Sequence, residues 1–410
     1  MSEKLSKFIR ENKGVLGVYG GIFFHALFGG LWTASLPYII KRLGGSDTSV
    51  GLCVGIHFVA YIISLTLSFI YSKKIAKINL KHLAMIGTGL VTFTVIGTYL
   101  VLLDSSMPQK LAMMLVIFFG ALQGIGICCI WPRIPLWLSI GHSGKALNHR
   151  LGLFNFSWSF ASITGPAIGG YLIEAGSQVT LAVASLLSAM SFVMICFAHK
   201  PQNTNVQSHE VELSDSEDIL FRVKYKWALR IIMFSMMVCM GLMRSQVALF
   251  FKFTKGFTES DFGMGLTLMS LAAFIIFTIT GRTHKWHYKK ILVLITQFAL
   301  ICGLLLLTFG NSLYLAWVGM IFIGGCRTFI YNSHQFYSLN DSKDRSNVMV
   351  IHEFVICMGI ITGSFMGGFL SDHINRYAPY YFAIAVIIIC LTIAGFIWTK
   401  KPPKTNICPH

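Results

Sequence analysis

Charged residues are scarce in this chain of 410 residues, and acidic ones are the scarcest. Only 12% of the residues are charged, and 33 lysines and arginines stand against 16 aspartates and glutamates, for a net charge of +17. An ordinary soluble domain carries about 25% charged residues. The shortage argues against a soluble enzyme, while the basic excess suits either nucleic acid or a membrane surface. Because 55% of the residues are hydrophobic, the membrane is favoured.

The signatures of catalysis and of metal binding are also missing. The chain contains no Gly-x-Ser-x-Gly, no His-Glu-x-x-His and no Gly-x-x-x-x-Gly-Lys-Ser/Thr. His352-Glu353 begins like a zinc-protease helix, but Ile356 stands where the second histidine is required. Nine of the ten cysteines lie in apolar stretches, with no disulfide or zinc spacing. The sequence therefore predicts no enzyme, no cofactor, no metal site and no nucleic-acid partner.

Long apolar runs are what the chain does contain. A helix needs about 20 apolar residues to cross the hydrocarbon core of a bilayer. Twelve windows qualify, at 14–40, 49–71, 82–103, 111–139, 151–173, 179–198, 228–251, 262–281, 291–310, 312–338, 347–371 and 379–398. The first follows four basic residues, as a signal peptide does, but its 27-residue length favours a retained span. The predicted fold is an all-α polytopic membrane protein with twelve transmembrane helices.

The basic residues predict the orientation, because basic flanks stay on the cytoplasmic side. With both termini inside, the inner segments hold 24 lysines and arginines and the outer loops hold 6. The short loops favour a bacterial inner membrane, and we expect the protein to work as a monomer in the lipid bilayer. The polar, acidic segment 199–227 is predicted to be a cytoplasmic linker between six-helix bundles at 1–198 and 228–400, followed by a tail at 401–410.

An internal repeat relates these two halves. Ile163-Thr-Gly-Pro-Ala-Ile-Gly-Gly-Tyr-Leu-Ile-Glu174 matches Ile361-Thr-Gly-Ser-Phe-Met-Gly-Gly-Phe-Leu-Ser-Asp372 at a constant offset of 198 residues. Glycines four apart allow close approach of a neighbouring helix, and a proline can bend its own helix. The helix-packing motif comprises Gly165, Pro166, Gly169, Gly170, Gly363, Gly367 and Gly368. These residues are either packing contacts alone or part of the transport machinery.

Twelve spans, duplicated halves and a central linker resemble the major facilitator superfamily of secondary transporters. Gly165-Pro166-Ala-Ile-Gly169-Gly170 is similar to the Gly-Pro-x-x-Gly-Gly signature of the proton-coupled antiporters in that family. The resemblance implies two pseudo-symmetric six-helix bundles, a cavity lined by spans one, four, seven and ten, and transport by alternating access. The connector after span two carries Ser72 where the family has an aspartate. The resemblance then implies that the cytoplasmic gate is built differently here.

Ionisable residues within the spans are the candidate functional residues, because each costs about 2.5 kcal/mol or more at the bilayer centre. His25 in span one is either a proton carrier or a structural hydrogen-bonding residue. Arg133 in span four points either inward or toward the lipid headgroups. Arg244 in span seven and Arg327 in span ten lie deeper, on spans that the resemblance assigns to the cavity.

Glu353 in span eleven is the only acid within the predicted spans. It is either the residue that binds the coupling proton or the ion-pair partner of an arginine such as Arg133 or Arg327, and we favour the ion pair or gate role. Its neighbour His352 and its repeat equivalent Asn155 join it as candidate coupling or gating residues.

Three arginines against one glutamate leave the interior basic, which favours an anionic substrate. The predicted substrate-binding residues are His25, Gln123, Arg133, Arg244, Arg327, Asn332 and His334. The sequence predicts a secondary transporter of a small organic solute, coupled to protons, with antiport or efflux favoured over uptake. The alternative is a transporter-like membrane sensor or scaffold that binds its ligand without moving it.

Overall fold

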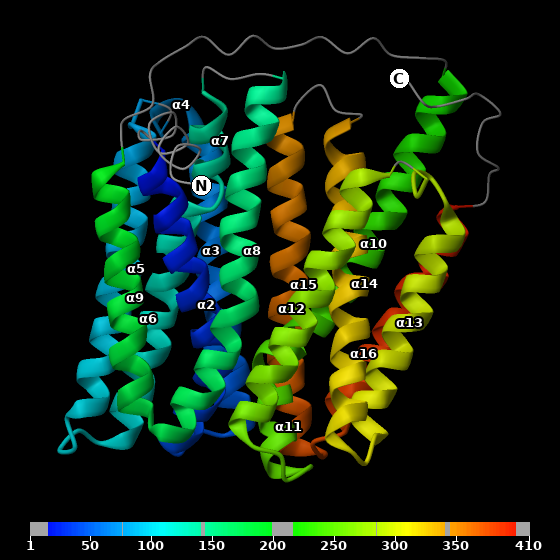
Figure 1. Cartoon of the computed structure of the whole chain (residues 1–410). Coiled ribbons are helices and arrows are strands. Elements are labelled where there is room, and N and C mark those ends of the chain that lie inside the picture. The colour runs from blue at the N-terminus through cyan, green and yellow to red at the C-terminus, as the bar shows by residue number, and fades with distance from the viewer. Residues whose placement is uncertain are drawn as a thin grey trace, which may run out of the picture.

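The computed structural model describes residues 15–75, 77–140, 144–198, 216–283, 285–340 and 345–398, and the regular elements in these ranges are all helices (Figure 1). The described ranges contain twelve long helices: α2 (Leu16–Arg42), α3 (Asp47–Ile70), α5 (Leu80–Leu103), α6 (Gln109–Ile130), α8 (Gly144–Ala175), α9 (Ser177–Phe197), α10 (Ser216–Ser245), α12 (Glu259–Arg282), α13 (Lys290–Phe309), α14 (Leu313–Asn340), α15 (Arg345–His373) and α16 (Ala378–Ile397). Three short helices join them: α4 (Ser72–Ile75), α7 (Arg133–Ser139) and α11 (Val247–Phe253).

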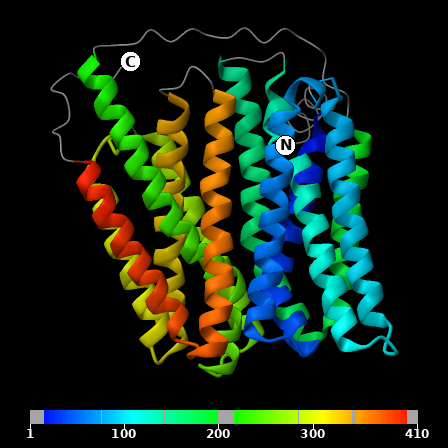
Figure 2. The ribbon, with the colours of Figure 1, turned by 180° about the vertical axis from the view of Figure 1, so that it is seen from behind.

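Eleven of the helices in the described ranges are long and apolar enough to cross a membrane. The twelfth long helix is α8, whose 32 residues suffice in length but include polar residues along its middle, namely Asn155, Ser157, Ser159, Ser162 and Thr164. It lies alongside the others, as Figure 2 shows from behind. The predicted twelve-helix fold class is confirmed.

The predicted linker 199–227 differs from the structure at its second end. α10 begins at Ser216, so residues 216–227 are helical, while 199–215 and the tail 401–410 lie outside the described residues. Phe221 and Tyr225 explain the early start. They are four apart on one helix face and buried, and Tyr225 packs on Tyr337 with ring centroids 5.0 Å apart.

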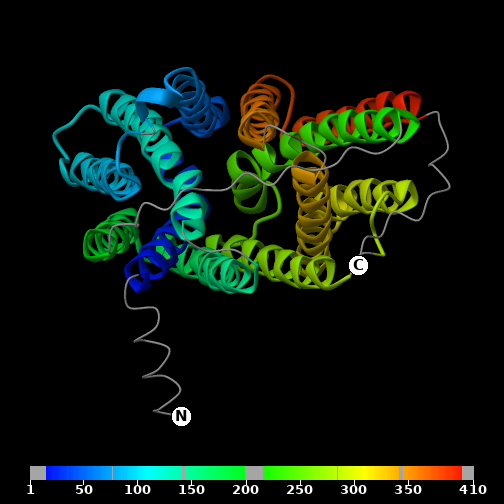
Figure 3. The ribbon, with the colours of Figure 1, turned by 90° about the horizontal axis from the view of Figure 1, so that it is seen from above.

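The helices form two bundles with the same packing order. In the first, neighbouring helices follow the path α3, α6, α5, α9, α2, α8. In the second they follow α12, α14, α13, α16, α10, α15, which is the same path six spans later. The bundles meet along two helix pairs, α8 with α12 and α3 with α15, and Figure 3 shows the bundles side by side from above. The structure thus has the pseudo-symmetry that the repeat predicts.

The repeated glycines make equivalent helix contacts in the two bundles. A Cβ on Gly165 would lie 2.5 Å from the Leu27 carbonyl oxygen, within the same bundle. A Cβ on Gly363 would likewise lie 2.0 Å from the carbonyl oxygen of Val238. The last glycine of each motif faces the other bundle instead. The missing Cβ of Gly170 leaves room for the start of α12, and that of Gly368 for the start of α3.

A pair of carboxylates joins the bundles at the end where α3 and α12 begin. Asp372 of α15 accepts hydrogen bonds from the backbone amides of Asp47, at 3.1 Å, and Thr48, at 2.7 Å. Glu174 of α8 accepts one from the amide of Ser260 in α12, at 2.8 Å. First-turn amides have no partner within their own helix and carry a partial positive charge, so both contacts are stabilising. We call these two contacts the clasp.

Ion pairs surround each side of the clasp in a matching arrangement. Asp47, which begins α3, pairs with Lys41 of its own bundle at 2.8 Å and with Arg376 of the other at 3.2 Å. Glu259, which begins α12, pairs with Lys252 of its own bundle and with Arg42 of the other, the latter at 3.8 Å. Each acid therefore connects a lysine of its own bundle to an arginine of the opposite one.

Lysines at the opposite end of the bundles cap helix C-termini. Lys81 donates to the carbonyl oxygens of Cys196 and Ala198 where α9 ends, both at 2.6 Å. Lys290 donates at 2.5 Å to the carbonyl oxygen of Trp398 after α16. A cation at a helix C-terminus satisfies free carbonyl groups and complements the helix dipole. The last lysine of each basic connector therefore stabilises its own bundle.

Candidate functional site

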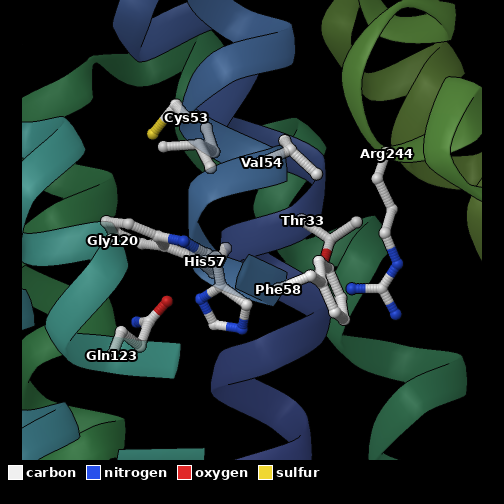
Figure 4. A pocket seen from close by; sticks show the side chains of 10 residues that line it. Thr33, Cys53, Val54, His57, Phe58, Gly120, Gln123 and Arg244 are labelled. Atoms are coloured by element: carbon white, nitrogen blue, oxygen red, sulfur yellow. The ribbon is translucent and has the colours of Figure 1, made fainter. Parts of the chain in front are cut away.

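The candidate site is a pocket between the two bundles (Figure 4). The space between its walls is about 420 Å³, part of which is open to solvent. Its walls are Trp32, Thr33, Leu36, Cys53, Val54, His57, Phe58, Gly120, Gln123 and Arg244. The first bundle supplies all of these residues except Arg244, which reaches in from α10.

Arg244 is the charged group of this pocket. It lies at the end of α10, just before the helix is interrupted at Gln246 and the chain continues as α11. Its guanidinium carbon stands 5.4 Å from the centre of the Phe58 ring across the bundle boundary, so the cation is stabilised by an aromatic face. Arg244 forms no ion pair with the described residues. Its N–H groups are therefore available to an anion.

Arg327 of α14 adds a second positive charge. Its side chain is half-buried and near enough to Arg244 for the two charges to repel each other. It, too, has no carboxylate partner among the residues that the structure describes. Two unpaired guanidinium groups in one region of low dielectric are costly, and a bound anion would offset that cost.

His57 and Gln123 form the opposite wall, where α3 and α6 are in close contact. A Cβ on Gly124 would lie 2.0 Å from the His57 carbonyl oxygen, so this glycine sets the helix spacing. The His57 side chain lines the pocket together with Gly120, and Gln123 is buried in the same wall. Sequence reasoning missed His57, although a histidine inside a predicted span was a signal that could have found it.

Glu353 faces a tyrosine and not an arginine. The Tyr61 hydroxyl of α3 donates to a Glu353 carboxylate oxygen at 3.3 Å. The surrounding cluster is apolar, with Leu65, Cys128 and Cys357 buried around Tyr61. Neither Arg133 nor Arg327 forms the favoured ion pair with Glu353, and the structure therefore contradicts that part of the interpretation. The carboxylate lies where the two bundles meet, on the α3–α15 contact.

His25 and Arg133 do not reach the pocket. His25 is 3% exposed, its Nδ1 has no hydrogen-bond partner in the described part of the chain, and its ring packs against Trp131 with centroids 6.0 Å apart. Arg133 begins α7 with its Nε buried and unpartnered among those residues.

The remaining predicted residues lie elsewhere in the bundles. Asn332 donates to the Thr280 hydroxyl at 2.6 Å and so joins α14 to α12. Asn155 accepts a hydrogen bond from the indole of Trp158, at 3.1 Å, on an exposed face of α8. His334 and His352 contact each other inside the second bundle. Of the predicted substrate-binding residues, Gln123 and Arg244 are the two that line the pocket.

Comparison with known proteins agrees with this architecture. The family model described as Major Facilitator Superfamily matches residues 18–342. Multidrug resistance protein 2 of Bacillus subtilis (strain 168) is 22% identical over 97% of this chain and 98% of its own length. Multidrug transporter protein MdtP of the same organism is 26% identical, but over only 42% of this chain and 30% of its own length.

A solved structure shares the fold. The nucleoside transporter NupG aligns over 94% of this chain and 99% of its own, with a TM-score of 0.70 and 14% sequence identity. Members of the matched superfamily are carriers of small solutes and not enzymes. The match covers more than half of the chain, and the twelve helices, the two bundles and the pocket between them agree with it. The protein therefore belongs to the major facilitator superfamily and is a multi-pass integral membrane carrier.

Proposed function

We propose that this carrier exports small organic anions in exchange for protons, by alternating access of the pocket between its bundles. The observation that carries the proposal is Arg244, a guanidinium in that pocket with an aromatic ring on one face and no ion pair with the described residues. Trp32 and Phe58 supply flat apolar walls beside it. This combination suits an aromatic carboxylate or phosphate, whose anionic end accepts paired hydrogen bonds from the guanidinium.

Export is supported by the Gly-Pro-x-x-Gly-Gly element at Gly165–Gly170 and by relatives that are named for multidrug resistance and transport. In the predicted orientation both termini are cytoplasmic and the clasp closes the outer end. Glu353 is the proposed proton-binding residue, because it lies at the bundle boundary in apolar surroundings with a single tyrosine as its described hydrogen-bond partner. A carboxyl group in such a place can exchange a proton as the bundles separate.

Binding is the first test. Purified protein would be mixed with benzoate, phenyl phosphate or the cation tetraphenylphosphonium, and its thermal unfolding measured. We expect the anions to raise the unfolding temperature of the native protein and to lose most of that effect in Arg244→Gln and Arg327→Gln. Arg376→Gln, in the ion pair beside the clasp, is the matched control that should keep it. Stabilisation by the cation alone, unchanged in Arg244→Gln, would rule out the basic pocket.

Transport is the second test. Proteoliposomes with an acidic lumen should accumulate labelled benzoate, and dissipation of the pH gradient should reduce accumulation to the level of empty liposomes. Accumulation that ignores the gradient would exclude proton exchange. Anions that bind and stabilise the protein but never accumulate would instead favour a sensor.

A further inference from the structure

The second bundle contains a buried histidine pair that the pocket does not use. His334 of α14 and His352 of α15 are 1% and 0% exposed. Their rings are nearly parallel, with centroids 4.7 Å apart and an interplanar angle of 19°, and their Nδ1 atoms are in hydrogen-bond contact. Neither Nε2 atom has a hydrogen-bond partner among the described residues. A buried polar atom without a partner is costly, so this arrangement needs an explanation.

Two Nδ1 atoms in hydrogen-bond contact share one hydrogen. One ring donates its Nδ1–H, which leaves its own Nε2 without a hydrogen, and the other ring accepts at Nδ1 and carries its hydrogen on Nε2. The neutral pair thus has one nitrogen that can accept a proton, the Nε2 of the donating ring. A proton added there gives an imidazolium that still donates its Nδ1–H to the neutral partner. A second proton would place two N–H groups face to face, so the pair holds one.

The ligand of this pair is a proton rather than a metal ion. A metal ion needs roughly 2 Å to each nitrogen, more room than a direct Nδ1 contact leaves. The described residues also provide no group of three or more histidine, cysteine, aspartate or glutamate side chains that could hold a metal ion.

The surroundings oppose a lasting positive charge on the pair, so a bound proton would be released again. Both rings are buried, and Arg230 of α10, whose guanidinium carbon stands 4.4 Å from the Trp227 ring centre, adds a positive charge that repels one on His334. Tyr331 of α14 packs edge-on to His352 at 5.1 Å. Ser338, four residues after His334, has a buried hydroxyl with no partner in the described part of the chain. That hydroxyl lies one turn nearer the predicted cytoplasmic end of α14.

We infer that His334 and His352 form a one-proton site, separate from Glu353, which links the helix that carries Arg327 to the helix that joins the first bundle. The inference adds a second proton site to the proposed exchange of anions for protons. Its transport experiment rests on that proposed function. A proton here places a positive charge in the contact between α14 and α15, and α15 is the helix that contacts α3 and carries Asp372 of the clasp. The exchange would then involve two titratable sites.

Nitrogen NMR of histidine-labelled protein in detergent tests the pair without any substrate. We expect a coupling through the hydrogen bond between the two Nδ1 nuclei and a single proton taken up by the two rings together. His352→Asn keeps a polar group near the Nδ1 position but cannot take up the proton. Absence of the coupling, or independent titration of the two rings, would overturn the inference even if transport is proton-coupled.

The charge moved per benzoate in proteoliposomes gives the second readout. We expect His334→Asn and His352→Asn each to move one proton fewer than the native protein, and Glu353→Gln likewise. His373→Asn, at the exposed far end of α15, is the matched control and should keep the native ratio. A native ratio in both His334→Asn and His352→Asn would show that the pair is only a packing contact. Loss of gradient-driven accumulation in the native protein would count against the proposed function and leave the NMR result to stand alone.

Discussion

Asp372 and Glu174 occupy equivalent places in the two bundles, and each accepts hydrogen bonds from the first turn of a helix in the opposite bundle. Ser46 and Thr258 form capping boxes with the third residue of the same two helices, α3 and α12. Each helix start therefore has its free amides shared between a side chain of its own bundle and a carboxylate of the other. The stability of these helix starts thus depends on contact between the bundles.

Neutralising the clasp should favour the conformation in which that end is open. A carboxylate at a helix N-terminus contributes about 0.3–1 kcal/mol, so Asp372→Asn and Glu174→Gln should each change the open-to-closed ratio by roughly 2- to 5-fold. The ratio would be followed by the labelling rate of a cysteine introduced at Thr48. Asp104→Asn is the control. Asp104 accepts hydrogen bonds from the hydroxyl and amide of Ser106, which lower its pKa, and Ser106 lies in the same loop and not in the opposite bundle. Equal labelling rates in all variants would contradict a role in closure.

Alanine at the last glycine of each motif should block closure without unfolding the bundle. A Cβ on Gly368 would stand 2.6 Å from the Asp47 carbonyl oxygen, across the boundary. Gly368→Ala should therefore be folded, remain open at the clasp and transport little. Gly363→Ala, with its Cβ 2.0 Å from a carbonyl oxygen of its own bundle, should lower the unfolding temperature instead. Size-exclusion profiles and cysteine labelling separate the two effects, and identical behaviour would refute the division of roles.

Glu353→Gln should weaken the coupling of transport to the pH gradient. The amide keeps the shape of the side chain but cannot release a proton, so benzoate exchange across the membrane should persist while gradient-driven accumulation falls. Tyr61→Phe retains the carboxyl group and should retain accumulation. Both activities are measured in the same proteoliposomes. Full accumulation in Glu353→Gln would assign the coupling proton to another group.

Removing the lysine caps should destabilise the bundles and leave substrate binding intact. Lys81→Gln and Lys290→Gln each remove a cation from helix-end carbonyl groups, a loss on the order of 1 kcal/mol. We expect a lower unfolding temperature in both, with benzoate still stabilising each variant. Lys73→Gln, in the exposed α4 segment, is the control. An unchanged unfolding temperature would show that the caps contribute nothing measurable.

The fold was predictable because hydrophobic length and the distribution of basic residues act along the chain itself. Twelve apolar windows and the repeat at 163–174 and 361–372 are sufficient to predict two bundles of six helices. The start of α10 was missed because Phe221 and Tyr225 lie within a polar stretch, and their burial depends on partners more than 60 residues away.

The site was predicted less well, because pairing between distant helices decides it. Arg244 and Gln123 could be chosen by residue type and span, but nothing local distinguishes Asn332, which bonds Thr280, from a residue that faces the cavity. The acids Asp47 and Glu259 escaped notice because they lie just before the predicted windows 49–71 and 262–281. For Glu353 an ion pair with an arginine or a gate role was favoured over proton binding on charge alone, whereas its hydrogen-bond partner in the structure is Tyr61.

The two boundaries between the bundles are of unequal strength. On the α3–α15 side, Asp372 accepts two amide hydrogen bonds and Asp47 adds the Ser371 hydroxyl at 2.6 Å and Arg376 at 3.2 Å. On the α8–α12 side, Glu174 accepts one amide hydrogen bond, and Arg42 stands 3.8 Å from Glu259. We expect the bundles to separate first along the α8–α12 side. The α3–α15 side should then act as the pivot about which one bundle rotates away from the other. Distances between spin labels on α8 and α12 should then lengthen before those between α3 and α15, and simultaneous lengthening would exclude a pivot.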